Sequence, residues 1–286
     1  MNFFYYLIRG GGYILARLPM PVLYLISDAM AFLACDVFKY RKRVVMKNIC
    51  RALPGRSDEE YKKIIKDFYR GFADVLVESF KMLGMSNEFI RKRIRLENPE
   101  VLQYLKDKNR GFIAVGGHFG NWEWLGVGMH KLTGMKSVVT YKPLSSKLMD
   151  KLMKQIRSEN GTMLVTMANT YRIVLQSKEP LGVLLVADQS PDPRTAIWVD
   201  FLGLETAWFS GPEKISKGTN SPLVFFALER EKRGYYKLRI DILHEHPAEA
   251  EEQELTRLHV KALEKLILKK PSDWLWSHKR WKHKRA

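Results

Sequence analysis

His118 and Glu123, near the middle of the chain, are a histidine and a carboxylate whose types suit acid–base chemistry. The apolar run 112–115 just before them is rich in strand-forming residues, and Gly116 and Gly117 break it. Ligands of open α/β sheets collect at the carboxyl ends of strands, where loops gather reactive side chains. This turn is therefore the first place to expect chemistry.

The local structure decides whether these two side chains can meet. On one continuous helix, residues with this spacing would lie about 140° apart and would not share a face. We expect Asn121 to cap a helix that begins at Trp122, which leaves His118 in the turn and Glu123 in the first helical turn. The helix dipole favours a carboxylate there. The chain can then fold back and bring Glu123 to the imidazole.

A carboxylate that holds an imidazole is suited to base catalysis. It fixes the tautomer and stabilises the imidazolium that forms when the ring takes a proton from a hydroxyl. The flanking glycines would leave backbone N–H groups free and allow a substrate to approach closely. Without the glycines, a satisfied loop histidine and a first-turn charge would be the simpler interpretation.

The composition points to an anionic partner, because the 286 residues carry a net charge of +17. That partner could be nucleic acid, an anionic membrane surface, a phosphorylated lipid or an acidic protein. Cys35 and Cys50 are in no CxxC arrangement, so neither a disulfide framework nor a cysteine-based zinc site is expected, as suits a reducing cytoplasmic compartment. No secretory signal is evident at the N-terminus.

Residues 3–38 are apolar and aromatic, but four charges interrupt them: Arg9, Arg17, Asp28 and Asp36. The longest charge-free run falls short of the roughly 20 residues that span a bilayer, so we expect an interfacial or re-entrant pair of helices. Core helices of a soluble domain would give a similar pattern. Six basic residues follow between Lys39 and Arg51 with no acidic one. Such clusters bind anionic headgroups on the cytoplasmic side.

The rest of the chain predicts an α/β fold with a mixed central sheet flanked by helices, after an N-terminal hydrophobic membrane-associating helical element. We expect residues 1–40 to form that element and residues 41–286 a single α/β domain. An amphipathic helix capped by Ser57 is predicted at 58–83. Strands are predicted at 112–116, 136–141, 162–166, 181–187, 197–202, 222–229 and 235–243. Helices are predicted near 87–95, 122–132, 145–158, 168–177, 210–218 and 249–268.

The residues of this turn also match a sequence motif of a known family, and further matches to that family extend over most of the chain. His118-Phe-Gly-Asn-Trp-Glu123 resembles the His-x4-Asp/Glu signature of the lysophospholipid acyltransferase superfamily, in the form used by bacterial lipid A late (secondary) acyltransferases. Further matches follow in the same order: Arg41-Lys-Arg43 to Asn48, Arg157 before Gly161, Asp188-Gln189, Phe201-Leu-Gly203 with Thr206 and Gly211, and Trp274-Leu-Trp276-Ser-His-Lys-Arg280.

This resemblance implies an O-acyltransferase that moves a fatty acyl chain from acyl carrier protein onto a hydroxyl of a lipid A precursor, with no cofactor. Acyl carrier protein is acidic and would match the basic surface; acyl-CoA is the alternative donor. The resemblance also implies an anchor in the inner (cytoplasmic) membrane, with the catalytic domain on the cytoplasmic face. Relatives with Glu in the signature act on other lipids too, so ornithine lipids, glycolipids and lysophospholipids stay open as acceptors.

In that mechanism His118, held by Glu123, deprotonates the acceptor hydroxyl, which attacks the acyl thioester. The oxyanion would be held by backbone N–H groups between Gly117 and Asn121, or by Arg157. Arg157 ends a predicted helix, where it would bind a phosphate or the carrier's phosphopantetheine, or simply complement the helix dipole.

The remaining candidates are less specific. Asp188 and Gln189 end an apolar run, where they would hold an arginine or a sugar hydroxyl, or form a turn. Ser210 and Glu213 read as a capping box whose N–H groups could bind an anion. The resemblance adds Thr206 and Gly211 as substrate-binding residues.

Two further sequence patterns could indicate a metal site or a nucleic-acid-binding surface. His244-Glu-His246 lacks a third ligand cluster, so no metal site is expected. The last eighteen residues mix tryptophan with basic residues, which suits a membrane interface or stacking on single-stranded nucleic acid. A non-catalytic basic protein that binds membranes or nucleic acid is the alternative from another class. A binder has no need of the glycine-flanked His118 turn, so nucleic acid is not expected.

Overall fold

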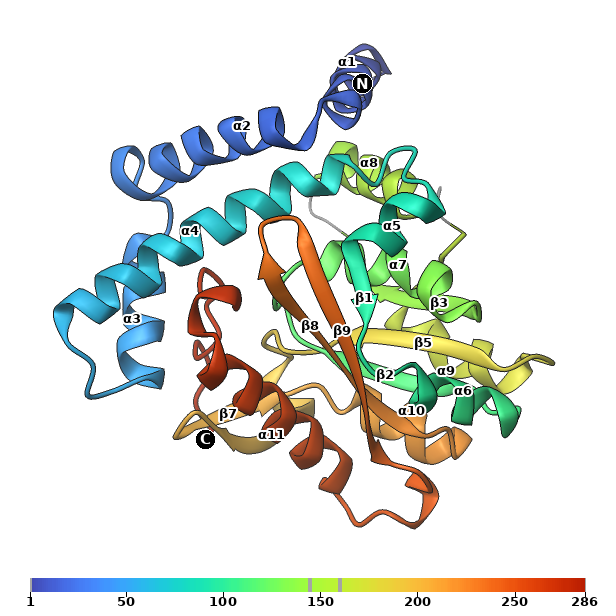
Figure 1. Cartoon of the computed structure of the whole chain (residues 1–286). Coiled ribbons are helices and arrows are strands. Elements are labelled where there is room, and N and C mark those ends of the chain that lie inside the picture. The colour runs from blue at the N-terminus through green and yellow to red at the C-terminus, as the bar shows by residue number, and fades with distance from the viewer. Residues whose placement is uncertain (1, 144–145, 159–160, 286) are drawn as a thin grey trace.

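A seven-stranded sheet organises the chain, which the computed structural model describes over residues 2–143, 146–158 and 161–285 (Figure 1). In spatial order its strands are β1 (Ile94–Leu96), β9 (Tyr235–His244), β8 (Leu223–Lys232), β2 (Phe112–Gly116), β5 (Leu181–Val186), β3 (Lys136–Tyr141) and β4 (Met163–Thr166). β8 and β9 pair antiparallel, whereas the other neighbours run parallel. This confirms the predicted α/β fold with a mixed sheet.

Helices cover both faces of the sheet (Figure 1). They are α1 (Asn2–Arg17), α2 (Met20–Phe32), α3 (Lys42–Ala52), α4 (Asp58–Phe80), α5 (Asn87–Arg93), α6 (Pro99–Asp107), α7 (Trp122–Thr133), α8 (Lys147–Ser158), α9 (Met167–Gln176), α10 (Gly211–Thr219) and α11 (Glu254–Lys269). A π-helical segment, η1 (Leu33–Val37), continues α2. The predicted cap of α4 is confirmed: the Glu60 N–H donates to Ser57 Oγ, and the Ser57 N–H donates back to Glu60.

The central strands explain why the strand predictions succeed. β2 is buried at every residue, as expected for a parallel strand covered on both sides, and it reads in sequence as one apolar run. Its side chains alternate between the two faces: Ile113 and Val115 join the core under α11, and Phe112 and Ala114 join the core under α7. The predicted strand at 197–202 forms β6 (Ile197–Phe201), but it pairs with β7 (Leu204–Trp208) in a separate two-stranded sheet.

The capping box expected at Ser210 is wrong. Ser210 makes no side-chain cap hydrogen bond at the start of α10. The Glu213 carboxylate is buried and accepts hydrogen bonds from Gln253 N at 2.7 Å, Thr256 N at 3.1 Å and Thr256 Oγ1 at 2.5 Å. Glu213 therefore satisfies the first N–H groups of α11, a tertiary demand that outweighs the local pattern.

The C-terminal segment packs into the domain. Trp274 is 2% exposed and Trp276 is fully buried, so these two tryptophans do not form the membrane-interface patch that their basic neighbours suggest. Asn48 Nδ2 donates to the carbonyls of Trp276 and His278, each at 2.8 Å, and Arg41 donates to the Ser277 carbonyl at 3.1 Å. The basic stretch after residue 38 is thus partly the helix α3, which holds the end of the chain in place.

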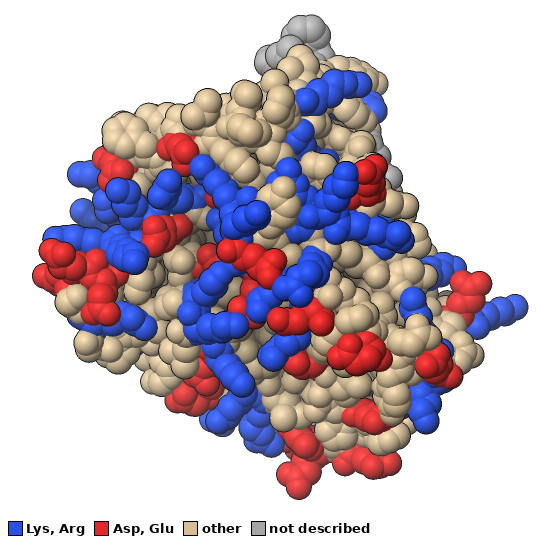
Figure 2. Space-filling model, in the orientation of Figure 1, with Lys and Arg blue, Asp and Glu red and all other residues tan. Residues whose placement is uncertain are grey.

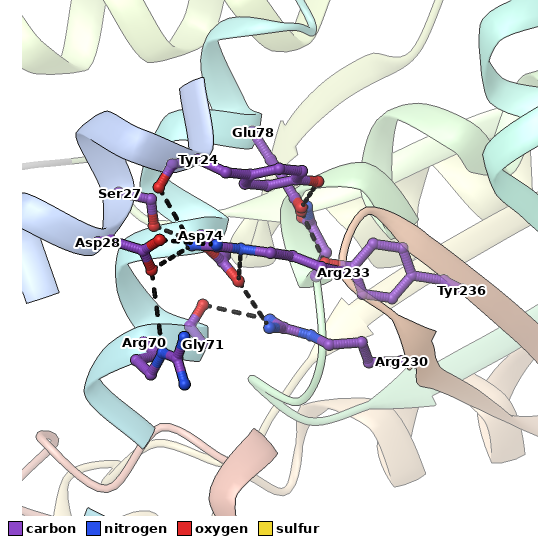
Figure 3. A network of polar contacts seen from close by, with 11 residues as sticks. Tyr24, Ser27, Asp28, Arg70, Gly71, Asp74, Glu78, Arg230, Arg233 and Tyr236 are labelled. Carbon is purple, nitrogen blue, oxygen red and sulfur yellow. Dashed lines mark hydrogen bonds and ion pairs between the residues drawn. The ribbon is translucent and has the colours of Figure 1, made fainter. Parts of the chain in front are cut away.

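A partly buried polar network fixes α2 alongside α4 (Figure 3). Arg233, at the tip of the β8–β9 hairpin, binds Asp28 of α2 through two hydrogen bonds of 2.8 and 3.0 Å. The same guanidinium binds Asp74 of α4 at 2.7 Å, and Ser27 Oγ of α2 donates to Asp74 at 2.6 Å. Arg230 pairs with Asp74 at 3.0 Å from the other side. Asp74 is 2% exposed, whereas the side chains of Arg233 and Asp28 are 30% and 42% exposed, so the clamp extends from the interior to the surface.

The network continues to the start of α7. Glu78 of α4 is fully buried and accepts hydrogen bonds from Tyr24 of α2 (2.8 Å), Tyr236 of β9 (2.6 Å) and Asn121 (2.6 Å). Asn121 in turn accepts from the Trp124 N–H at 2.9 Å, which confirms it as the cap of α7. Burial raises the pKa of Glu78. The N-terminal helices are therefore linked to the turn that carries His118.

Gly120 in that turn offers a test of the fold. Its φ is +57°, and a Cβ would lie 2.3 Å from the Leu228 carbonyl oxygen. Gly55 has a φ of +80° but open space around its Cβ position. We predict that Gly55→Ala lowers the free energy of unfolding by about 1 kcal/mol through backbone strain alone, and that Gly120→Ala lowers it by about 3 kcal/mol because it adds a clash with backbone. Urea unfolding of the two variants measures the difference; equal losses would contradict the packing described for the turn.

Candidate active site

The centre of the site is a hydrogen-bonded pair between His118 and Asp188. His118 follows the end of β2, and Asp188 follows the end of β5, its parallel neighbour. The pairing register sets Gly116 beside Val186 at the last paired position, so two residues further on His118 stands beside Asp188. Asp188 Oδ1 lies 2.5 Å from His118 Nδ1, and the backbone N–H of His118 donates to Asp188 Oδ2 at 2.7 Å.

The surroundings of Asp188 keep it ionised. Its side chain is 2% exposed, and Trp274 Nε1 donates to Oδ2 at 2.7 Å. Burial alone would raise the pKa of Asp188, but the His118 imidazole and the three hydrogen bonds outweigh burial and lower the pKa to about 2. At neutral pH Asp188 is therefore a buried carboxylate aimed at one side of the imidazole.

The other side of the imidazole is partly exposed and faces Gln189. The His118 side chain is 18% exposed, and Gln189 Nε2 lies 3.2 Å from His118 Nε2. With the Nδ1 proton donated to Asp188, Nε2 carries the lone pair, to which Gln189 donates in this conformation. Trp122 contacts the ring edge-on at 5.4 Å between centroids and so limits its rotation. The hydrogen bond to Asp188 therefore holds the ring in the tautomer that a general base needs, with its lone pair on Nε2.

Glu123 has a different partner from the one we expect from the sequence. Arg157 Nη2 and Nε donate to its two carboxylate oxygens at 2.7 and 3.0 Å, a bidentate ion pair between α7 and α8. Burial opposes the charge on Arg157, but Glu123 outweighs it and raises the pKa of the guanidinium. The prediction that Glu123 holds the imidazole is therefore corrected: Asp188 occupies that position, because the strand register brings it there.

The backbone of the turn is also more occupied than the sequence suggests. A Cβ on Gly117 would lie 2.6 Å from Leu263 and 3.1 Å from Asp188 Oδ2, so this glycine allows Asp188 and α11 to pack closely. The N–H groups of His118, Phe119 and Gly120 donate to Asp188, to the Gly117 carbonyl (2.7 Å) and to the Asp273 carbonyl (3.0 Å). The expectation that these three N–H groups are free for a substrate is therefore wrong.

A cavity of about 700 Å³ opens beside the pair. His118, Glu123, Arg157 and Gln189 form a polar part of its wall. Much of the remainder is apolar, with contributions from Val127, Val139, Leu164, Met167, Leu184 and Phe209. A cavity of this size and character suits a ligand with a long apolar part and one reactive polar group.

The other predicted site residues do not line this cavity. Asp188 and Gly117 lie behind His118, and Asn121 is fully buried as the cap of α7. Thr206 is 1% exposed; it donates to the Leu204 carbonyl at 2.6 Å and accepts from Trp281 at 2.8 Å. Gly211 packs against Met167, a wall residue. A substrate-binding role for Thr206 and Gly211 stays a prediction.

Several residues of the cavity wall are not among those predicted from the sequence. Trp122 touches the imidazole, and Tyr141, Lys142 and Phe209 contribute to the wall. Lys142 follows the carboxyl end of β3. Ligands of open α/β sheets collect at such strand ends, so the reasoning that predicted a site at the end of β2 could also have predicted Lys142. Within the described residues, no group of three or more His, Cys, Asp or Glu side chains could hold a metal ion.

Comparisons with known proteins find similarity over nearly the whole chain. A family model described as bacterial lipid A biosynthesis acyltransferase matches residues 1–283. The chain is 26% identical over 268 residues to a lipid A biosynthesis palmitoleoyltransferase of Escherichia coli (strain K12), which covers 93% of this chain and 87% of that protein. It is 23% identical over 274 residues to a lipid A biosynthesis lauroyltransferase of the same organism, covering 94% and 88% of the two chains.

Proposed function

The chain belongs to the bacterial lipid A biosynthesis acyltransferase family and is therefore an O-acyltransferase, and on this premise we propose that it moves a fatty acyl chain from acyl carrier protein to a hydroxyl of a lipid A precursor, with His118 as the general base. The observation that carries the catalytic part is the His118–Asp188 pair in the wall of a largely apolar cavity. The donor, the catalytic roles and the orientation at the membrane are all parts of this proposal.

His118 would activate the acceptor hydroxyl. Nε2 takes the hydroxyl proton as the oxygen attacks the thioester carbonyl, while Asp188 holds the Nδ1 proton and stabilises the imidazolium. The tetrahedral intermediate then breaks its C–S bond, and the imidazolium returns the proton to the departing thiolate. One C–O bond forms, one C–S bond breaks, and one proton passes from oxygen to sulfur. His118 ends the cycle as it began.

Arg157 and Gln189 are the proposed donors to the oxyanion. Both line the cavity with His118, whereas three N–H groups of the turn are already engaged. Nε and Nη2 of Arg157 donate to Glu123, which would leave Nη1 for the substrate. Glu123 thus takes the role of a residue that orients Arg157. A preorganised cation near the developing charge stabilises the transition state more than the ground state.

The apolar wall would hold the acyl chain. Each buried methylene contributes about 0.8 kcal/mol, so the depth of the cavity can select chain length. The donor would dock through charge, because the chain carries a net charge of +17 and acyl carrier protein is acidic. Figure 2 shows many Lys and Arg side chains over α4 and the β8–β9 hairpin, with Asp and Glu side chains among them.

We also propose that α1 and α2 lie in the plane of the membrane surface. By length and composition, Met20–Val37 is apolar enough to cross a bilayer. However, the clamp of Asp28 and Ser27 to Arg233 and Asp74 holds α2 flat along α4 (Figure 3), and a crossing helix would have to break it. Large apolar side chains of this region are exposed: Ile14, Val22, Leu25, Phe32, Leu33, Val37 and Phe38. Figure 2 shows this outer surface as mostly uncharged, with basic residues beside it. That is the pattern of an interfacial helix pair.

The membrane face would also lie close to the cavity. Tyr5 of α1 hydrogen-bonds to Gln155 of α8, the helix that carries Arg157. An acceptor lipid held in the cytoplasmic leaflet could thus reach His118 without leaving the membrane surface. Membrane attachment and catalysis are separate in this arrangement, because they depend on different residues.

The catalytic proposal predicts that His118→Ala lowers acyl transfer at least a thousandfold, the scale on which loss of a general base and its partner acts in hydrolases. The assay incubates purified protein with acyl carrier protein thioester and a lipid A precursor, and repeats with acyl-CoA. His246→Ala, at an exposed histidine, is the matched control and should retain activity. Vesicle flotation should be unchanged in both variants. Full activity of His118→Ala would refute the mechanism, and product formed exclusively from another lipid would refute the acceptor.

The in-plane proposal predicts that both ends of the chain lie on the same side of the membrane. Single cysteines at Gly10→Cys and Lys284→Cys, in a background with Cys35→Ser and Cys50→Ser, report the two ends. A membrane-impermeant maleimide should label neither cysteine in intact spheroplasts and both after permeabilisation. Labelling of Gly10→Cys alone in intact spheroplasts would show that α2 crosses the bilayer.

A further inference from the structure

Arg280 is a buried arginine whose charge has no direct partner. It is 2% exposed, and none of Nε, Nη1 and Nη2 has a hydrogen-bond acceptor among the described residues. Its guanidinium carbon stacks over the Trp208 ring at 4.5 Å from the centroid. Arg230, the comparable buried arginine, instead pairs with Asp74 at 3.0 Å. A buried, unpaired charge is costly, so its presence calls for a reason other than stability.

Arg280 lies on the segment that closes over Asp188. Trp274, at the start of that segment, donates to Asp188, and Ser190, two residues after Asp188, donates to the backbone carbonyl of Arg280 at 2.7 Å. Burial lowers the pKa of Arg280 to about 9, against the opposing effect of the Asp188 carboxylate. Arg280 is therefore still a cation at neutral pH, and Asp188 is the charge that favours it.

The same cation acts on the imidazoles nearby. Burial is the main cause that lowers the pKa of His259 and of His278 to about 4. In both, Asp188 opposes the shift and Arg280 adds to it. The buried carboxylate and the buried guanidinium thus push the protonation of the surrounding imidazoles in opposite directions.

We propose that Arg280 is a positioning residue for the general base: its charge balances that of Asp188, so that Asp188 can orient His118 without holding it in the protonated form. This rests on the proposed function of His118. A lone buried carboxylate 2.5 Å from Nδ1 would favour the imidazolium, and a base that already carries its proton cannot accept another. On this proposal, the unfavourable free energy of burying the Arg280 charge is offset by its function, because it allows His118 to act as a base at neutral pH.

Other charged groups face the same imidazole. From the cavity side they are Glu123, Arg157 and Lys142, with Glu123 and Arg157 paired to each other. From the C-terminal segment His278 lies close enough for His118 to contribute to the lowering of the His278 pKa, and from α11 His259 packs on Trp208. None of these is a permanent buried charge without a direct partner, as Arg280 is, so the effect is assigned to Arg280.

The test compares Arg280→Met, which keeps the length of the side chain and removes its charge, with Arg280→Lys, which keeps a charge. In Arg280→Met the acid limb of the pH profile of kcat/KM should move up by about one pH unit, so that the loss relative to the native protein is about tenfold larger at pH 6 than at pH 8.5. Arg280→Lys should shift the limb less. Arg285→Met, at an exposed arginine of the same tail, is the matched control and should not shift it.

Two measurements separate this proposal from its alternatives. The melting temperature of Arg280→Met should hold or rise, because an unpaired buried charge has been removed. Nitrogen-15 NMR of labelled histidine follows the titration of His118 without any assay, so it remains decisive even if His118 is not the base. A titration of His118 that is the same in the native protein and in folded Arg280→Met would overturn the proposal. If Arg280→Met fails to fold, Arg280→Gln also removes the charge, and a titration of His118 in folded Arg280→Gln that is the same as in the native protein would overturn the proposal.

Discussion

The hydrogen bond between His118 and Asp188 is the interaction around which the site is built. It follows from the parallel pairing of β2 and β5, because residues at the same register beyond the last paired position emerge side by side. The two residues are far apart in sequence, and the pairing of the strands brings them together. A sheet edge of this kind fixes the distance between a carboxylate and an imidazole more firmly than a single flexible loop could.

Both ends of the chain contribute to this pair. From the C-terminal side, Trp274 donates to Asp188 and Arg280 adds a buried positive charge. From the N-terminal side, α2 reaches the cap of α7 through Glu78 and Asn121. The N-terminal helix α2 and the C-terminal tail are therefore parts of one polar framework around the turn. This explains how sequence matches to the family can be spread over the whole chain and still concern one site.

Much of the fold could be predicted, because apolar strands and amphipathic helices carry their own periodicity. The place of His118, in the turn that follows a central strand, could also be predicted from the apolar run and the glycines beside it. Its hydrogen-bond partner could not: the sequence indicated Glu123, whereas Asp188 reaches the imidazole through the order of the strands, which periodicity does not contain. Glu213 illustrates the same limit: its local capping pattern is genuine, but the unsatisfied N–H groups of α11 compete for it and win. Where tertiary contacts supply a better partner, local signals fail.

The most direct test of the His118–Asp188 hydrogen bond is to observe the proton on Nδ1 of His118 by NMR. A proton in a short hydrogen bond to a carboxylate gives a resolved low-field signal in the proton NMR spectrum, and His118→Gln identifies it by its loss. The account predicts that the signal persists in Glu123→Gln and disappears in Asp188→Asn. Its loss in Glu123→Gln, together with its survival in Asp188→Asn, would show that Glu123 holds the imidazole and would contradict the arrangement described here.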